Sequence, residues 1–286
     1  MSLGVVFGAG GTLGEAYHRG VLQALEERGL DPRGAEVVVG TSAGSIVAAS
    51  VRRKVPATPI PPLADRAARR RRRVLPDRST ALAVLHRPRQ ALNALLLTPE
   101  MASGRISTEF MARSLRLSHG DRWPDAATWI VAVRRDDGKR VVFGQPGQPV
   151  TDIASAVAAS CAIPGYFAAV EIDGAAYVDG GVHSPTNADL LASSDLDTVV
   201  VSSPMSADPR RARPKLDLPL RMLFHGYLRS EVWTLRRSGS QVVSIEPDAP
   251  VLAVMGFNMM NGRRAEEVHD RAYELACRRL DESGLV

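Results

Sequence analysis

The segment Glu36-Val37-Val38-Val39-Gly40-Thr41-Ser42-Ala43-Gly44 decides the fold expected for this chain. Its run of valines is typical of a strand buried on both faces, and apolar residues resume at helical spacing over 45–53. The glycines between them mark a sharp turn. A similar unit comes earlier, with a strand over 3–7, a glycine-rich turn over 8–14 and a helix that ends near Gly29. Two such units predict a parallel sheet that is covered by helices on both faces.

The α/β pattern breaks after residue 53 and returns near Thr128. Prolines and arginines fill the start of this break, and a helix is expected over 81–97. We therefore expect one domain over 1–286, with a basic insertion at about 54–105 rather than a linker between two domains. The remaining elements are expected as strands over 129–133, 140–143, 170–172, 176–178, 198–202 and 242–245, and as helices over 152–162, 218–237 and 263–280.

Composition places the chain among ordinary globular proteins. Hydrophobic residues make up 45% and charged residues 23% of the 286 residues, which excludes wholesale disorder. No apolar run approaches the roughly 18 residues that span a bilayer, and the N-terminus lacks the basic start of a signal peptide. Cys161 and Cys277 are too few for a disulfide framework or a zinc site, so we expect two free buried thiols. These features favour a cytoplasmic location.

The net charge of +5 is unevenly distributed along the chain, because residues 52–89 hold twelve basic and two acidic residues. Three interpretations stay open: a solvated arm without a specific partner, attraction to anionic membranes, and nucleic-acid binding. Each arginine near an anionic lipid surface contributes about 1 kcal/mol, which makes peripheral membrane contact a real option. Nucleic acid is the least favoured partner, since no aromatic residues alternate with the arginines.

The clearest chemical signal is the G-x-S-x-G spacing of Gly40 to Gly44 between a strand and a helix. This is the context that a nucleophilic serine needs, because the turn forces the serine into a strained conformation above the sheet edge. The glycines two residues before and after Ser42 let the strand and the helix approach each other. The alternative is an ordinary Gly/Ser-rich turn, but the flanking elements favour Ser42 as a nucleophile.

The glycine-rich turn over 8–14 is a second signal. Successive glycines let backbone N–H groups converge on one oxyanion, and each well-placed donor contributes roughly 3 kcal/mol. A dinucleotide-binding loop is the alternative and fits poorly. Leu13 occupies the third glycine position of a G-x-G-x-x-G that starts at Gly8, and the second strand ends in Gly40 rather than an acidic residue.

A third signal is Asp179-Gly180-Gly181, directly after the strand over 176–178. An exposed aspartate with a pKa of about 3.9 is a poor base, but burial beside an apolar strand raises that pKa. The alternative is a turn aspartate followed by glycines, which is common.

Histidine is the more usual activator of a serine. Among the six histidines, His183 lies in a plausible active-site loop, whereas His18 and His269 are expected on helices and partly exposed. The order Ser42, Asp179, His183 matches that of ordinary α/β-hydrolase triads, although four residues between acid and base would be unusual.

Together these three segments resemble the motifs of the patatin-like phospholipases, and they come in the right order. The stretches over 159–167 and 184–188 also resemble that family, so the resemblance covers about 1–53 and 105–205. It implies a three-layer α/β/α fold with a mainly parallel central sheet. It also implies a Ser42–Asp179 dyad without histidine, and the site residues then comprise an oxyanion hole at Gly10, Gly11 and Thr12 and the supporting glycines Gly40, Gly44, Gly180 and Gly181.

The reaction implied by the resemblance is hydrolysis of a lipid acyl ester, of the phospholipase A or lysophospholipase type, without cofactor or metal. Two positions depart from the family pattern: Leu13 stands where Arg or Lys is frequent, and Ala9 where glycine is frequent. Neither departure removes a backbone N–H. The alternatives are an esterase or acyltransferase that uses other acyl compounds, and a membrane-binding protein with weak catalysis.

Overall fold

The computed structural model describes residues 1–53, 97, 104, 106–120, 122–212 and 217–285. The arginine-rich run beyond residue 53 lies outside the described residues, and so does the helix expected over 81–97 except for its last residue. The single domain with its insertion therefore stays a prediction. Within the described ranges, none of the helices is both long and apolar enough to cross a membrane.

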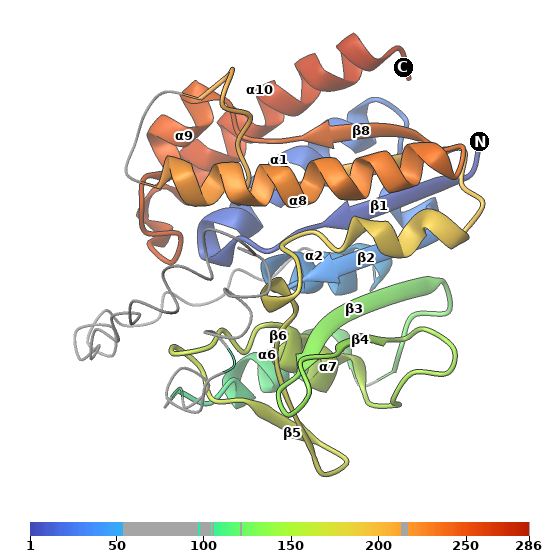
Figure 1. Cartoon of the computed structure of the whole chain (residues 1–286), viewed down its shortest axis with the longest axis vertical. Coiled ribbons are helices and arrows are strands. Elements are labelled where there is room, and N and C mark those ends of the chain that lie inside the picture. Colours follow the sequence, from blue (N-terminus) through green and yellow to red (C-terminus); the bar gives the residue numbers. More distant parts are fainter. Residues whose placement is uncertain (54–96, 98–103, 105, 121, 213–216, 286) are drawn as a thin grey trace.

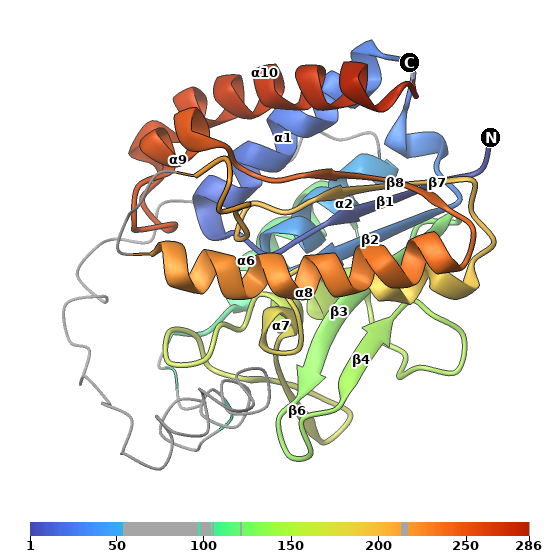
Figure 2. The ribbon, with the colours of Figure 1, turned by 45° about the horizontal axis from the view of Figure 1, so that its top comes forward.

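The centre of the molecule is an eight-stranded sheet (Figures 1 and 2). Strands β3, β2, β1, β7 and β8 run parallel, whereas β4 and β6 pair antiparallel with β3, and β5 pairs antiparallel with β6. The strands are β1 Leu3–Phe7, β2 Val37–Thr41, β3 Ala127–Arg134, β4 Arg140–Phe143, β5 Val170–Ile172, β6 Ala175–Asp179, β7 Thr198–Ser202 and β8 Gln241–Ile245. The mainly parallel sheet predicted from the sequence is confirmed.

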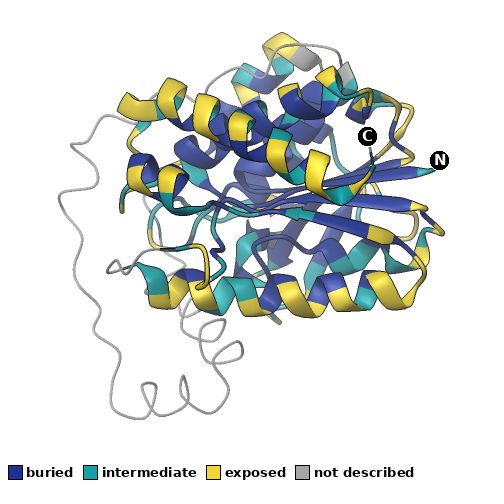
Figure 3. Ribbon diagram, turned by 90° about the horizontal axis from the view of Figure 1, so that it is seen from above, coloured by how far each residue is buried: buried dark blue, intermediate teal, exposed yellow. Residues whose placement is uncertain are grey.

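Helices cover both faces of this sheet, as Figure 3 shows with buried strands between helices whose outer faces are exposed. Side chains alternate between the faces of a strand, so neighbouring valines belong to different cores. Val5 belongs to the hydrophobic cluster that includes residues of α1, α2, α7 and α10, whereas Val6 belongs to the cluster that includes residues of α8 and of the turn over 188–193. The helices are α1 Gly11–Glu27, α2 Ala43–Arg53, α6 Glu109–His119, α7 Ile153–Ser160, α8 Leu218–Arg237, α9 Ala249–Met255 and α10 Ala265–Ser283. The three-layer α/β/α arrangement is therefore confirmed.

Two helices and one thiol differ from the sequence-based expectation. Helices α6 and α9 were not expected. In α9, Pro250 occupies the first turn, where its missing N–H costs nothing, and the Asp248 side chain accepts a hydrogen bond from the Val251 amide. Cys161 is buried as expected, but Cys277 is only partly buried, so that part of the prediction is wrong.

Candidate active site

The turn between β2 and α2 holds Ser42 in a strained conformation. Ser42 has a φ of 54°, in the left-handed region that non-glycine residues rarely adopt. The turn also brings α2 against the end of β1, where a Cβ on Gly44 would lie 2.0 Å from the carbonyl oxygen of Phe7. Glycine at that position is thus a steric requirement. The same reasoning applies to Gly40 and Gly180, whose added Cβ atoms would lie 2.5 and 2.3 Å from backbone atoms.

Side-chain hydroxyls fix the backbone of Ser42 on two sides. The Ser160 Oγ accepts the Ser42 amide at 2.9 Å and donates to the carbonyl of Val131 at 2.6 Å. The Ser45 Oγ and amide both donate to the Ser42 carbonyl, at 2.6 and 2.8 Å. Ser160 was not singled out from the sequence, because it is one small residue in an alanine-rich helix. Its place in the stretch over 159–167 that resembles the family was the only available signal.

The register of β3 brings Asp179 to Ser42. Val131 and Ala132 both pair with β4 along one edge of β3. Thr41, the last residue of β2, also pairs with Val131, and Asp179, the last residue of β6, also pairs with Ala132. A residue pairs with only one strand on each edge, so β2 and β6 lie end to end along the other edge of β3. Because β2 and β6 run in opposite directions, their carboxyl ends meet head-on.

Asp179 is buried, with 5% of its surface exposed, and its carboxylate lies within hydrogen-bonding reach of Ser42. The carboxylate accepts the amide of Gly181 at 2.7 Å, and the Ser42 side chain lies near enough to lower the pKa of Asp179. Burial raises this pKa from 3.8 to about 6, and the two neighbours offset only part of this effect. A carboxylate with such a pKa is a better proton acceptor near neutral pH than an exposed one.

The glycine-rich loop contacts both the turn that carries Ser42 and the turn that carries Asp179. The carbonyl of Gly8 accepts the amide of Gly44 at 3.2 Å, and the amide of Ala9 donates to Pro185 at 2.7 Å. A Cβ on Gly181 would lie 3.4 Å from the Cβ of Ala9, so the loop packs against the Asp179 turn as well. Ala9 is therefore not a free donor.

The three amides that the family resemblance implies for the oxyanion hole have no backbone partner among the described residues. Leu13 donates to the carbonyl of Met259, whereas Gly10, Gly11 and Thr12 donate to no backbone acceptor within the described part of the chain. They lie at the N-terminus of α1, which has no side-chain cap and carries the positive end of the helix dipole. Gly11 has a φ of 59°, which glycine adopts without strain. This N-terminus is suited to hold an oxyanion. Leu13 is fully buried, so an apolar side chain suits this position.

His18 contacts the glycine-rich loop from inside the molecule and is fully buried. Its Nδ1 contacts the Ser202 Oγ and its Nε2 contacts the Gly8 carbonyl oxygen, both at 2.7 Å. Burial lowers the pKa of His18 to about 4, so the ring is neutral at physiological pH. The expectation of partial exposure is wrong, because both ring nitrogens find partners inside the molecule. His183 is half-buried at the end of the turn over 180–182.

Comparisons with known proteins show what this chain is similar to. The family model described as patatin-like phospholipase matches residues 5–192. No curated protein matches the chain. Among solved structures, VipD from Legionella pneumophila is 12% identical with a TM-score of 0.42, and the alignment covers 98% of this chain and 66% of VipD. The type III effector protein ExoU is 16% identical with a TM-score of 0.41, and the alignment covers 100% of this chain and 54% of ExoU.

The structure of the ExoU–SpcU complex from the type III secretion system of Pseudomonas aeruginosa gives a similar result. It is 16% identical with a TM-score of 0.39, covering 99% of this chain and 51% of that one. The chain thus spans between about half and two thirds of the length of the solved structures it matches. The family match extends over most of the chain and includes the Ser42 turn, the Asp179 turn and the glycine-rich loop, and this chain belongs to the patatin-like phospholipase family.

Proposed function

We propose that this chain is a serine lipid acyl hydrolase of the phospholipase A or lysophospholipase type, with Ser42 as nucleophile and Asp179 as general base. The observation that carries the proposal is the approach of the Ser42 side chain to the buried carboxylate of Asp179, whose pKa is raised. Family membership supports a lipid ester as substrate.

In the first half of the reaction, the Ser42 Oγ attacks the ester carbonyl carbon while Asp179 takes the hydroxyl proton. The negative charge moves to the former carbonyl oxygen, which the amides of Gly10, Gly11 and Thr12 hold. The tetrahedral intermediate then collapses, and the carbon–oxygen bond to the alcohol breaks. The leaving oxygen takes the proton from Asp179, so the alcohol departs neutral and an acyl-Ser42 ester remains.

In the second half, water attacks the acyl-enzyme carbonyl and Asp179 accepts a proton from that water. The same three amides hold the second oxyanion. Collapse breaks the bond to the Ser42 Oγ, which regains the proton from Asp179, and the fatty acid is released. The dyad needs no further proton donor in either half.

An exposed apolar segment beside the glycine-rich loop supports a lipid substrate over a soluble one. A Cβ on Gly11 would lie 2.8 Å from the sulfur of Met260, and the carbonyl of Met259 accepts the Leu13 amide. Phe257, in the same segment, leaves 76% of its surface exposed. Such exposure beside the loop that carries the proposed oxyanion hole suits contact with a lipid surface. We therefore also propose a peripheral membrane contact for the working enzyme.

A fluorophosphonate probe tests the nucleophile. Wild type is expected to be labelled, and Ser42→Ala is expected to remain unlabelled with the same melting temperature. A panel of lysophospholipids, diacyl phospholipids, triglycerides and short p-nitrophenyl esters then tests the substrate class. Turnover restricted to short soluble esters, or acyl transfer to added alcohols in place of hydrolysis, would replace the lipid assignment. An unlabelled wild type would favour a binding protein.

The choice between dyad and triad is tested separately. Asp179→Asn is expected to remove nearly all turnover, because its amide cannot accept the hydroxyl proton. His183→Ala is expected to keep most of it. Equal loss in the two variants would assign the proton transfer to a triad that includes His183.

A further inference from the structure

The segment over 184–188 contacts all three parts of the candidate site. The carbonyl of Pro185 accepts the amide of Ala9 in the glycine-rich loop at 2.7 Å. The Nδ2 of Asn187 lies 3.2 Å from the Oγ1 of Thr41, which precedes Ser42. The same Nδ2 lies 3.4 Å from the carbonyl oxygen of Gly180, which follows Asp179. This segment therefore links the turns that carry the nucleophile and the base to the loop that carries the free amides.

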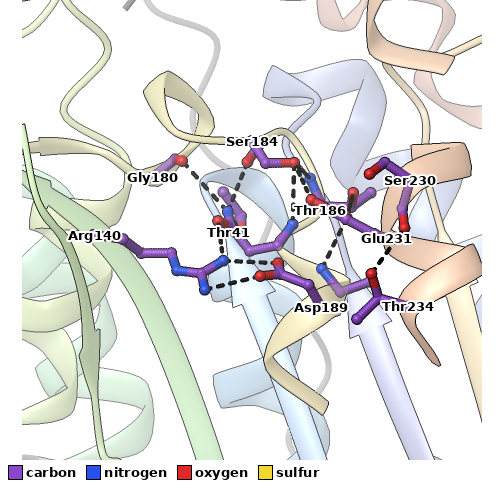
Figure 4. A network of polar contacts seen from close by, with 11 residues as sticks. Thr41, Arg140, Gly180, Ser184, Thr186, Asp189, Ser230, Glu231 and Thr234 are labelled. Carbon is purple, nitrogen blue, oxygen red and sulfur yellow. Dashed lines mark hydrogen bonds and ion pairs between the residues drawn. The ribbon is translucent and has the colours of Figure 1, made fainter. Parts of the chain in front are cut away.

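Neighbouring groups determine which way the Asn187 amide faces. The Arg140 guanidinium, which can only donate, lies 3.4 Å from the Asn187 Oδ1 and holds Asp189 in a bidentate ion pair at 2.7 and 2.9 Å (Figure 4). The Asn187 Nδ2 donates to the Ser184 carbonyl at 2.6 Å. Asn187 also has a φ of 54°, a conformation that asparagine tolerates better than most residues. Its place in the network is thus specified by both side chain and backbone.

A buried carboxylate on α8 holds this segment from the opposite side. Glu231 leaves 3% of its surface exposed and accepts the hydroxyls of Ser184 and Thr186 (Figure 4). It also accepts the amide of Ala188 at 2.9 Å. Burying a carboxylate is costly unless it is well hydrogen-bonded, and α8 could pack here with an apolar residue. A carboxylate with three donors from one five-residue segment instead fixes where that segment lies.

We propose that Glu231 is a positioning residue for the reaction, acting through Asn187 to hold the turns of Ser42 and Asp179 in register. The proposal rests on the proposed function, since it assigns Glu231 a role in that chemistry without contact with the substrate. Misplacement of reacting groups by about 1 Å can cost about 10²-fold in rate. Glu231 therefore affects kcat although its side chain lies on a different layer of the fold.

Three variants separate positioning from general stability. Glu231→Leu removes all three acceptor contacts and is expected to lower kcat by about 10²-fold while KM changes little. Glu231→Gln keeps the shape and one acceptor oxygen, and the hydroxyls can rotate toward its amide, so it is expected to recover most of this loss. Leu235→Ala, one turn along the same helix and fully buried, is the matched control. It lowers the melting temperature and leaves kcat unchanged.

Asn187→Gly keeps the left-handed backbone and removes the amide, so a loss of kcat in this variant alone tests the link even if Glu231→Leu folds poorly. If Glu231 acts through Asn187, the double variant of Asn187→Gly with Glu231→Leu loses no more kcat than Asn187→Gly alone. Full additivity of the two losses would overturn the link, and so would wild-type kcat in Glu231→Leu.

Hydrogen exchange gives a readout that does not require turnover. The amide of Ala9 is bonded to Pro185, so its exchange is expected to speed up in Glu231→Leu relative to that of Val6 in the preceding strand. Leu235→Ala should not change that ratio. An inactive wild type with this exchange pattern refutes the proposed function but supports the positioning role. An active wild type with unchanged exchange and kcat in the variants refutes the positioning role alone.

Discussion

Asp179→Asn is expected to stabilise the fold as it removes turnover, and the gain in stability should depend on pH. The pKa of Asp179 rises from its ordinary value of 3.8 to about 6 in the native state, chiefly through burial. The native protein therefore takes up this proton at a higher pH than the unfolded chain. As pH rises from below 4 to above 6, ionised Asp179 progressively lowers the free energy of unfolding. Asparagine stays neutral throughout.

The size of the effect follows from that rise in pKa. Each pKa unit corresponds to about 1.4 kcal/mol, so the full cost of ionised Asp179 is about 3 kcal/mol. This cost is present at pH 8, falls to about half at pH 5 and vanishes below the ordinary pKa of the unfolded chain. The asparagine oxygen can still accept the Gly181 amide, so most of the difference is expected to be recovered as stability.

His18 makes the same experiment informative, because its effect on stability has the opposite sign. Its native pKa is lowered from 6.5 to about 4, so the unfolded chain takes up the proton first and stability falls as pH drops through 6.5. Between pH 8 and pH 5 the two groups nearly cancel. The stability of wild type alone would hide both effects, and the difference between variant and wild type isolates Asp179.

Urea unfolding of wild type and Asp179→Asn at pH 8, 6.5 and 5 measures this difference. The variant should be more stable by about 3 kcal/mol at pH 8, with a smaller gain at each lower pH. A gain that is equal at all three values, or a variant less stable than wild type at pH 8, would refute a buried, raised-pKa carboxylate at this position.

The remaining predictions concern activity and the groups around the dyad. kcat/KM is expected to rise with pH through about 6 and then level off, because Asp179 must be ionised to take the Ser42 proton; a pH–rate profile checks this. Ser160→Ala leaves the Ser42 amide and the Val131 carbonyl without their partner. It should lower the free energy of unfolding by about 1–3 kcal/mol and slow fluorophosphonate labelling, measured by urea unfolding and labelling kinetics. His18→Gln should abolish the stability loss that His18 causes below pH 6.5, so the variant gains stability relative to wild type from pH 8 to pH 5 in the same unfolding series.

The sequence was sufficient to predict the elements that carry the site. Valine-rich strands followed by glycine-rich turns place the ends of β1 and β2 together, because a parallel sheet aligns its carboxyl ends at one edge. The glycines over 8–14 predicted backbone N–H groups that converge on one oxyanion, and the family resemblance assigned them to Gly10, Gly11 and Thr12. These residues begin α1, where the first N–H groups have no backbone partner in the described part of the chain.

The approach of Asp179 was not predicted in its actual form. The sequence suggested a strand end near Ser42, whereas β6 is antiparallel and meets β2 end to end on β3. Strand pairing depends on long-range contacts that local patterns do not encode. Ser160, His18 and Glu231 were missed for a related reason, since a hydroxyl, an imidazole or a carboxylate on a helix shows its role only through partners distant in sequence.

Because β2 and β6 meet end to end along β3, their pairing registers with β3 set the distance between Ser42 and Asp179. Within β3, the residues that pair with β6 are Ala132, Val133 and Arg134. A slip of one residue would shift Asp179 by about 3.3 Å and turn its side chain to the other face of the sheet. Such a slip would also turn the buried Tyr177 and Val178 to opposite faces, so core packing and the dyad would be lost together. Lengthening the hairpin tip at Asp173-Gly174 leaves the pairing of β6 with β3 unchanged, whereas an inserted residue between 175 and 179 changes the position of Asp179 relative to Ser42.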